Sequence, residues 1–238
     1  ASRDNACRPV GLELGPDGAL YLLDMQRDVI EHPDYIPQKV KEKLNLRGGE
    51  DRGRIFRVTP KGGLPTARIK LSKASKEELV RELSSANQWR RVTAQRLLVE
   101  RQDKAAVPLL KNLAAHGPSP LGRLHALWTL QGLGALEESL VLKALADPHP
   151  GIRENALILS EHFGLPKSTA LPPKILALAN DPAVRVRFQA ALTLGEFENP
   201  GTQAALLNIL RRDHRFHWSR LAVFSSLRRG ASEIFRSL

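Results

Sequence analysis

Two histidines near the C-terminal end are spaced so that both could bind one divalent metal ion. His214 and His217 are three residues apart in RRDHRFHWSR (211–220) and are preceded by Asp213. Catalytic zinc takes three protein ligands and a water molecule, and the sequence places no third ligand beside the two histidines. The remaining histidines show no HExxH or triad-like grouping. We therefore expect a loop at a helix start, with no metal bound.

Six arginines in the same region could bind an anionic partner. Arginine binds phosphate through two hydrogen bonds, and a nearby aromatic ring can stack on an exposed base. Trp218 lies among them, although it also falls on the expected apolar side of its helix, three residues before Leu221. A charged surface, or a contact with further repeats, is the competing interpretation. The arginines are Arg211, Arg212, Arg215, Arg220, Arg228 and Arg229.

Composition limits the classes of function. The 238 residues carry a formal net charge of +11, and the excess lies in 61–238 because 1–60 are neutral overall. Cys7 is the only cysteine, which excludes an internal disulfide and a CxxCH haem site. No stretch approaches the 18 to 20 apolar residues of a membrane-spanning helix, and the N-terminus lacks both a signal-peptide layout and an initiator methionine. We expect a fragment of a larger protein.

The first 60 residues predict a small antiparallel sheet. Two runs with alternating apolar residues flank GPDG (15–18), a sequence typical of a tight turn, and GRIFRVTP (53–60) predicts a third strand. A polar insertion, 25–52, separates the second strand from the third. Three such strands bury too little apolar surface to be stable alone. They must pack either on the helical part or on further sheet that this chain lacks.

From about residue 75 the sequence predicts pairs of amphipathic helices with an internal repeat. The second helix of each pair carries an arginine, and these arginines recur at intervals of 32, 30, 34 and 33 residues. Each is followed three residues later by Ala94, Ala126, Ala156, Ala190 or Val223, which lets neighbouring helices approach closely. Asp147 and Asp181 each precede a proline, the favoured order for a helix start, so we expect these aspartates to cap their helices. About five pairs are predicted, with a sixth beginning at SEIFRSL.

This repeat length, the pairing and the Asp and Arg at the turn resemble HEAT repeats. The resemblance covers 75–238, follows a linker at 61–74, and implies a mainly α protein, a HEAT-like α-α superhelix incomplete at its C-terminus. In HEAT repeats the recurring Asp and Arg usually link one repeat to the next as a ladder, with direct ligand contact as the alternative. The ladder residues implied here are Arg91, Arg123, Asp147, Arg153, Asp181, Arg187, Asp213 and Arg220.

The front part resembles the closing blade of a six-bladed β-propeller. RPVGLELGPDGALYLLD followed by GRIFRVTP is similar to sorbosone and soluble glucose dehydrogenases. The order of this blade, RDVIEHPDYIP, GRIFRVTP and RLHALWTLQGLGAL resembles membrane-bound dehydrogenase-like proteins of planctomycete and verrucomicrobial bacteria, in which HEAT-like repeats and often a cytochrome c domain follow the propeller. Residues 1–60 would then be part of one blade.

The resemblance implies an extracytoplasmic, dehydrogenase-like parent that uses a quinone of the PQQ type, with haem in a separate domain. Where that family commonly has Asp-Trp-Tyr, this sequence has Asp24-Met25-Gln26, and five blades are absent. We expect this fragment to be non-catalytic and to hold no cofactor. The residues placed on ligand-facing loops are Arg8, Asp24, Arg27 and His32, with turn stabilisation as the alternative role.

Two functions follow from these patterns. The first is a non-catalytic scaffold whose helical repeats bind a protein partner or an adjacent domain of the same polypeptide. The second is a HEAT-type nucleic-acid-binding module that uses the basic C-terminal repeats. The salt dependence of binding distinguishes the two.

Overall fold

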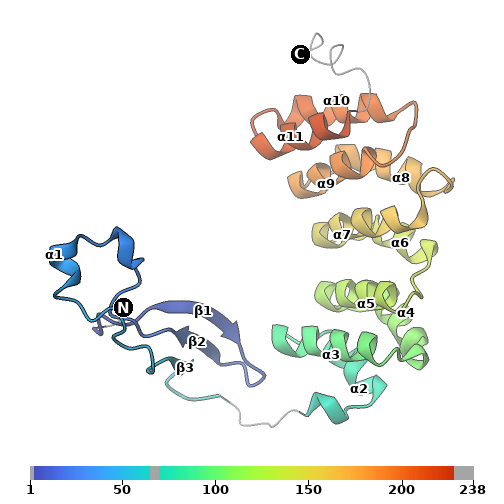
Figure 1. Ribbon diagram of the computed structural model, residues 1–238. Coiled ribbons are helices and arrows are strands. Elements are labelled where there is room, and N and C mark those ends of the chain that lie inside the picture. Colours follow the sequence, from blue (N-terminus) through green and yellow to red (C-terminus); the bar gives the residue numbers. More distant parts are fainter. Residues whose placement is uncertain (1–2, 65–69, 228–238) are drawn as a thin grey trace. The chain divides into compact units, whose positions relative to one another are not determined.

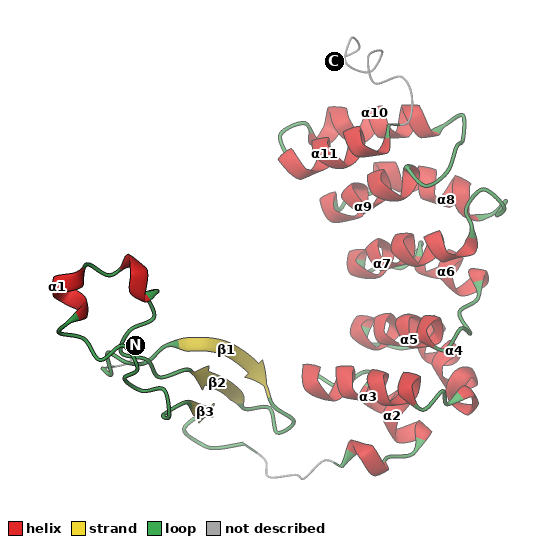
Figure 2. Ribbon diagram, viewed as in Figure 1, coloured by secondary structure: helices red, strands yellow, loops and turns green. Residues whose placement is uncertain are grey.

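The chain folds into two compact units. The computed structural model describes residues 3–64 and 70–227. The first unit comprises Ala1–Lys73 with Ser85–Thr93, and the second comprises Ala74–Ser84 with Ala94–Leu238. The sheet belongs to the first unit. The stack of paired helices belongs to the second, except that 85–93, which include the start of one helix, fall in the first (Figures 1 and 2).

A three-stranded antiparallel sheet forms the body of the first unit, as the sequence predicts. Strands β1 (Pro9–Leu14), β2 (Leu20–Asp24) and β3 (Arg54–Val58) lie in the order β1-β2-β3. In the GPDG turn the Gly15 amide donates to the Ala19 carbonyl at 2.8 Å, and Gly18 takes a φ of +84°, which glycine adopts at little cost. Asp17 Oδ1 accepts a hydrogen bond from the Ala19 amide at 3.0 Å. The turn therefore uses its aspartate and its second glycine in the roles that such sequences usually have.

Apolar side chains are exposed on both faces of this sheet. Because directly paired residues share a face, the register pairs Leu12 with Leu22 and Leu22 with Phe56 on one side, and Leu23 with Ile55 on the other. Leu12 is 60% exposed and Ile55 is 70% exposed. Neither face of the sheet is therefore covered as it would be in a complete hydrophobic core.

The insertion between β2 and β3 is mostly irregular. It contains a 3₁₀ turn (Pro33–Tyr35) and a short helix, α1 (Gln38–Lys41). The Asp28 amide donates to the Gly48 carbonyl at 3.1 Å, which holds the two ends of the insertion together. Its exposed tip carries Ile30 and Tyr35.

After the sheet, ten helices of the described residues, α2 to α11, form five consecutive pairs. The first helices of the pairs are α2, α4, α6, α8 and α10, and the second helices are α3, α5, α7, α9 and α11. Figure 1 shows α5, α7, α9 and α11 in one row and α4, α6, α8 and α10 in the other. The bounds are α2 Lys76–Glu82, α3 Gln88–Glu100, α4 Val107–His116, α5 Pro120–Gly132, α6 Glu138–Ala144, α7 Pro150–Ser160, α8 Leu171–Ala177, α9 Val184–Leu194, α10 Thr202–Asp213 and α11 His217–Ser226.

The core of the stack lies between the two rows and between successive pairs. The small residue three positions after each repeat arginine is fully buried in every pair, at 0% exposure. Helical spacing predicts a buried stripe of Ile152, Ala156, Leu159 and Phe163. The first three are buried on α7, whereas Phe163 lies beyond its end in a 3₁₀ turn and is only partly buried. A small side chain at the crossing point lets helices of adjacent pairs pack closely, because nothing larger separates their backbones.

The prediction that Asp147 and Asp181 cap helices is wrong. Helix α7 begins at Pro150, and its N-cap is His149, whose Nδ1 accepts from the Gly151 amide at 3.1 Å. Helix α9 begins at Val184 with Ala183 at the N-cap. The two aspartates lie before these caps, in the loops, because their carboxylates bind arginines of the preceding pair.

Candidate functional site

Three arginine–aspartate pairs link consecutive helix pairs through the row of second helices. In each, the arginine Nε donates to one carboxylate oxygen and Nη2 to the other, in the bidentate geometry that guanidinium favours. The Nε–Oδ2 and Nη2–Oδ1 distances are 2.8 and 2.9 Å for Arg123–Asp147, 2.7 and 2.8 Å for Arg153–Asp181, and 2.8 and 2.5 Å for Arg187–Asp213. We call these three pairs the ladder.

The third nitrogen of each ladder arginine binds the loop of its own pair. Arg153 Nη1 donates to the Asp147 carbonyl at 2.8 Å and to the Pro148 carbonyl at 3.1 Å. Arg123 and Arg187 make the same contacts with the carbonyls five and six residues before them. Each guanidinium therefore joins its own loop to the next loop, and none of the three has a free face for a ligand.

Burial and hydrogen bonds fix the charge of the central pair. Burial alone raises the pKa of Asp181, but hydrogen bonds from Arg153 and from the Ala183 amide outweigh it and hold that pKa below its usual value. The carboxylate of Asp181 in turn raises the pKa of Arg153. Both groups remain ionised at neutral pH, so the link is a charged one.

The two ends of the repeat series differ from its middle. Arg91 Nη1 donates to the Ser85 and Ala86 carbonyls at 2.7 and 2.9 Å, as in the ladder, but the position of the ladder aspartate in the next loop is occupied by Gly117. Arg220 Nη1 donates to the His214 carbonyl at 2.5 Å. Its Nη2 lies 3.5 Å from His217 Nδ1 and reaches no carboxylate among the described residues.

His214 and His217 each have a local contact. His214 Nδ1 lies 3.0 Å from the Arg211 carbonyl, and the His217 ring meets the Trp218 ring edge-on at 5.5 Å. The carboxylate of Asp213 is 1% exposed and bound to Arg187, so it cannot join them as a ligand. No group of three or more His, Cys, Asp or Glu within 3–64 and 70–227 is arranged to hold a metal ion.

The end of α10, the loop after it and the start of α11 display basic and aromatic side chains together. Arg211, Arg212 and Arg215 are exposed, as the sequence predicts, whereas Arg228 and Arg229 lie outside the described residues. Trp218 is 70% exposed. Its expected place on the buried side of α11 is therefore wrong, and so is that of Leu221, which is 46% exposed. The physical reason is that Ala222 and Val223 already fill the inward side of this helix.

In the first unit, the side chain of Asp24 is fully buried and holds the end of the sheet together. It accepts hydrogen bonds from the Arg8 amide at 2.7 Å, the Gln26 amide at 3.0 Å, and Arg54 Nε and Nη2 at 3.0 and 2.6 Å. Burial alone raises the pKa of Asp24, but the Arg8 amide, Arg54 and the Gln26 amide lower it to about 2. With four donors around it, this carboxylate is saturated.

The other three loop candidates of the first unit also have local partners. The Arg8 side chain donates to the Cys7 carbonyl at 3.1 Å, and Arg27 lies 3.8 Å from Glu50. His32 accepts from the Asp34 amide at 3.3 Å and caps the 3₁₀ turn. These contacts are of the turn-stabilising kind.

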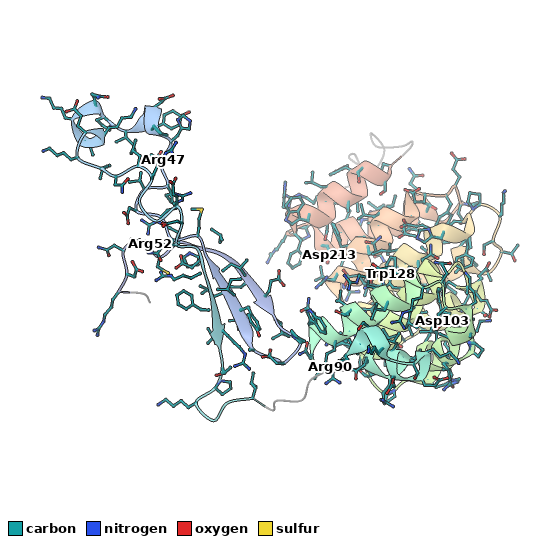
Figure 3. The ribbon with its side chains drawn as sticks, turned by 60° about the horizontal axis from the view of Figure 1, so that its bottom comes forward. Arg47, Arg52, Arg90, Asp103, Trp128 and Asp213 are labelled. Atoms are coloured by element: carbon teal, nitrogen blue, oxygen red, sulfur yellow. The ribbon has the colours of Figure 1, made fainter. Side chains whose placement is uncertain are left out.

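Sequence reasoning missed a second set of links between the second helices. Trp128, which is labelled in Figure 3, donates from Nε1 to Asn155 Oδ1 at 2.9 Å. His125 Nδ1 lies 2.7 Å from Gln95 Oε1. Thr193 Oγ1 donates to Glu161 at 2.7 Å, and burial raises the pKa of this glutamate. The partners are separated by about one repeat, a signal that comparing equivalent positions of the repeats would have found. Arg54, the partner of Asp24, had no such signal because it lies in a strand whose pairing had first to be known.

Comparisons with known protein families support two regions. Residues 1–62 match a domain of unknown function (DUF7133), and residues 137–228 match HEAT repeats. The chain therefore contains HEAT repeats, preceded by a DUF7133 domain that holds the small sheet. No curated protein and no solved structure matches the chain. Among the helices of the described residues, none has the length and apolarity needed to cross a membrane.

Proposed function

We propose that this chain is a non-catalytic scaffold whose HEAT repeats bind a protein partner, or an adjacent domain of the same polypeptide, through the row of second helices. One observation carries the proposal: large apolar side chains are exposed on two of the second helices, α5 and α11. Leu121 and Trp218, both two residues before a repeat arginine, are 44% and 70% exposed, and Leu221, one residue after, is 46% exposed.

The chemistry of this row suits a protein surface. Exposed tryptophan and leucine side chains contribute most to binding where a partner covers them and excludes water. The ladder arginines use their hydrogen-bonding nitrogens within the stack, where they link its helix pairs. A rigid row with exposed apolar side chains is what a repeat scaffold offers to a partner.

A test compares two variants of the full chain. Replacing Trp218 and Leu221 by alanine removes the exposed apolar side chains of α11, whereas Leu109→Ala on α4 removes a 38% exposed leucine from the row of first helices. We expect a protein retained by the wild-type chain from an extract of its source cells to be lost at least about tenfold with the first variant and retained with the second. Equal retention by all three proteins would contradict a role for the second helices.

We also infer that the scaffold belongs to a larger, extracytoplasmic protein with a dehydrogenase-like propeller, of which the sheet is one blade. The support is the similarity of RPVGLELGPDGALYLLD and GRIFRVTP to the closing blade, together with a sheet that exposes apolar side chains on both faces. A blade has a neighbour on each side, so both of its faces are apolar. The gene sequence upstream of the codon for Ala1 tests this: further GPDG-bearing strand pairs are expected there, and a start codon without them would contradict it.

Local contacts of three loop candidates in the first unit argue against a quinone site at these residues. Asp24 is saturated by its four donors, and the side chains of Arg8 and Arg27 bind the backbone and Glu50. A quinone of the PQQ type would therefore be held by other blades of the parent protein, and haem by a separate domain.

The cluster of Arg211, Arg212 and Arg215 beside Trp218 favours a second candidate, a nucleic-acid-binding module. Phosphate contacts by these arginines would make the affinity fall steeply with salt. Titrating labelled single-stranded and duplex DNA and RNA with the full chain at ~50 and ~200 mM salt decides the matter. No binding at either concentration removes this candidate, whereas tight binding at the lower one that Arg212→Gln weakens would favour it.

A further inference from the structure

The α11 end of the stack carries an arginine in ladder geometry without a ladder partner. Arg220 is anchored through Nη1 to the His214 carbonyl, six residues before it, as Arg123, Arg153 and Arg187 are anchored to theirs. In those three, Nε and Nη2 bind an aspartate of the following pair. Within the described chain, the same two nitrogens of Arg220 meet no carboxylate.

A second observation concerns the apolar position four residues after each arginine. Leu127, Leu157 and Ala191 occupy it in α5, α7 and α9, and they are 1%, 0% and 0% exposed. At these junctions the following second helix packs against the one before it, as α7 does on α5 and α9 on α7. Phe224 occupies the same position of α11 and is 39% exposed. Both the polar and the apolar element of an inner junction are thus present at α11, but among the described residues no carboxylate binds Arg220 and Phe224 stays 39% exposed.

We propose that Arg220 and Phe224 form a docking face for a further helix pair of the HEAT type, one that carries an aspartate in the loop between its two helices. The two carboxylate oxygens of that aspartate would accept hydrogen bonds from Nε and Nη2 of Arg220. The second helix of the pair would cover Phe224. This occupant is defined by the three inner junctions, whose chemistry the face repeats. The inference rests on the scaffold function proposed above and is independent of the dehydrogenase-like parent.

The loops at the other end of the repeat series argue against a second copy as the occupant. A copy stacked end to end would present the loop of its first pair, in which Ser85 stands at the ladder position, and the next loop has Gly117 there. Neither residue offers a carboxylate. The series therefore has a direction: its first loops lack the aspartate that would bind a preceding arginine, and its last described arginine lacks the aspartate that would follow.

A chain extended at its end tests the docking face. A copy of residues 206–227 holds the last eight residues of α10, the loop and α11. Added directly after Leu238, it places the copied Asp213 26 residues after Arg220, the same spacing as between Arg187 and Asp213. We expect the melting temperature to exceed that of the unextended chain by about 5 °C or more, with a matching gain in helical circular dichroism. Asn at the copied aspartate, or Arg220→Lys, is expected to remove most of this gain.

The matched control is Arg220→Lys in the unextended chain, for which we expect a shift below about 2 °C because the two nitrogens have no carboxylate to lose. Equal shifts in the extended and unextended chains, or an extension that gains no helix, would overturn the inference, since the copied pair is folded in its original place. Sedimentation showing a dimer of the unextended chain that Phe224→Asp dissociates would assign the face to a second copy instead. The retention experiment tests the proposed partner binding separately, because it measures capture of a partner and not the stability of the stack.

Discussion

Two buried aspartates, Asp24 in the sheet and Asp213 in the helical stack, are held by arginine in similar ways but in very different surroundings. Asp213 lies beside Ile209 and Leu210, which are 0% and 2% exposed, so its bond to Arg187 is added to a complete apolar core. Asp24 ends a strand whose neighbouring leucine, Leu23, remains 36% exposed. In the stack the charged pair sets the register of elements that already pack, whereas in the sheet the polar contacts do much of the ordering themselves.

The largest loss of stability is expected when one ladder arginine is removed. Arg187→Met keeps much of the apolar stem but leaves the buried carboxylate of Asp213 unpaired, so we expect the free energy of unfolding to fall by about 3–5 kcal/mol. Urea denaturation followed by circular dichroism measures it. The matched control is Arg220→Met at the end of the series, expected to change stability by less than about 1 kcal/mol.

A double variant separates the charge from the packing. If Arg187→Met is combined with Asp213→Leu, most of the lost stability should return, because no buried charge is left without a partner. A double variant as unstable as Arg187→Met alone would show that the ladder is needed for more than charge compensation.

The next effect compares apolar side chains of the two units. Leu159→Ala removes a fully buried side chain from α7, and we expect a loss of about 2–5 kcal/mol. Ile55→Ala removes a 70% exposed side chain from β3, and we expect a loss below about 0.5 kcal/mol. Thermal unfolding of both variants checks this. A large loss for Ile55→Ala would mean that the sheet is packed against another surface in solution.

The sequence predicted the helices of the stack better than the side-chain contacts between them, for a physical reason. Helix pairs and the buried alanines follow from periodicity, which is a local property of the chain. The role of Asp147 and Asp181 depends on which arginine lies opposite them one repeat away, and the favourable Asp-Pro order pointed to a cap instead. The exposed Trp218 could not be foreseen either, because Ala222 and Val223 compete for the same inward side of α11, and only packing decides between them.

In the sheet the sequence predicted the strands and the turn but not the contacts at their ends. GPDG and the alternating apolar residues are local signals. The bonds of Asp24 with Arg54 join residues 30 positions apart, and no repeat provides a second example from which to infer them.

A smaller, local effect is expected from acid. Because the pKa of Asp24 is about 2 in the folded sheet and 3.8 without its contacts, its charge stabilises the sheet above about pH 4, and this stabilisation is lost as the pH falls toward 2. The Nε–H signal of Arg54 in NMR spectra should broaden or move in this range. In Asp24→Asn that signal should already be altered at pH 7 and change little on acidification, whereas Asp51→Asn, at a side chain 82% exposed, should behave as the wild type.

The smallest expected effect tests whether the two units respond independently. Gly18 has a φ of +84°, so Gly18→Ala places a β-carbon in the left-handed region and should weaken the hairpin by about 1 kcal/mol. Hydrogen exchange of the β1 and β2 amides should accelerate about fivefold, while the amides of α5 to α9 keep their rates. Gly18→Asn is the control, since asparagine tolerates this region better than alanine. If the helical amides also exchange faster in Gly18→Ala, the sheet contributes to the stability of the stack. The stack could then no longer be described as stable without the sheet.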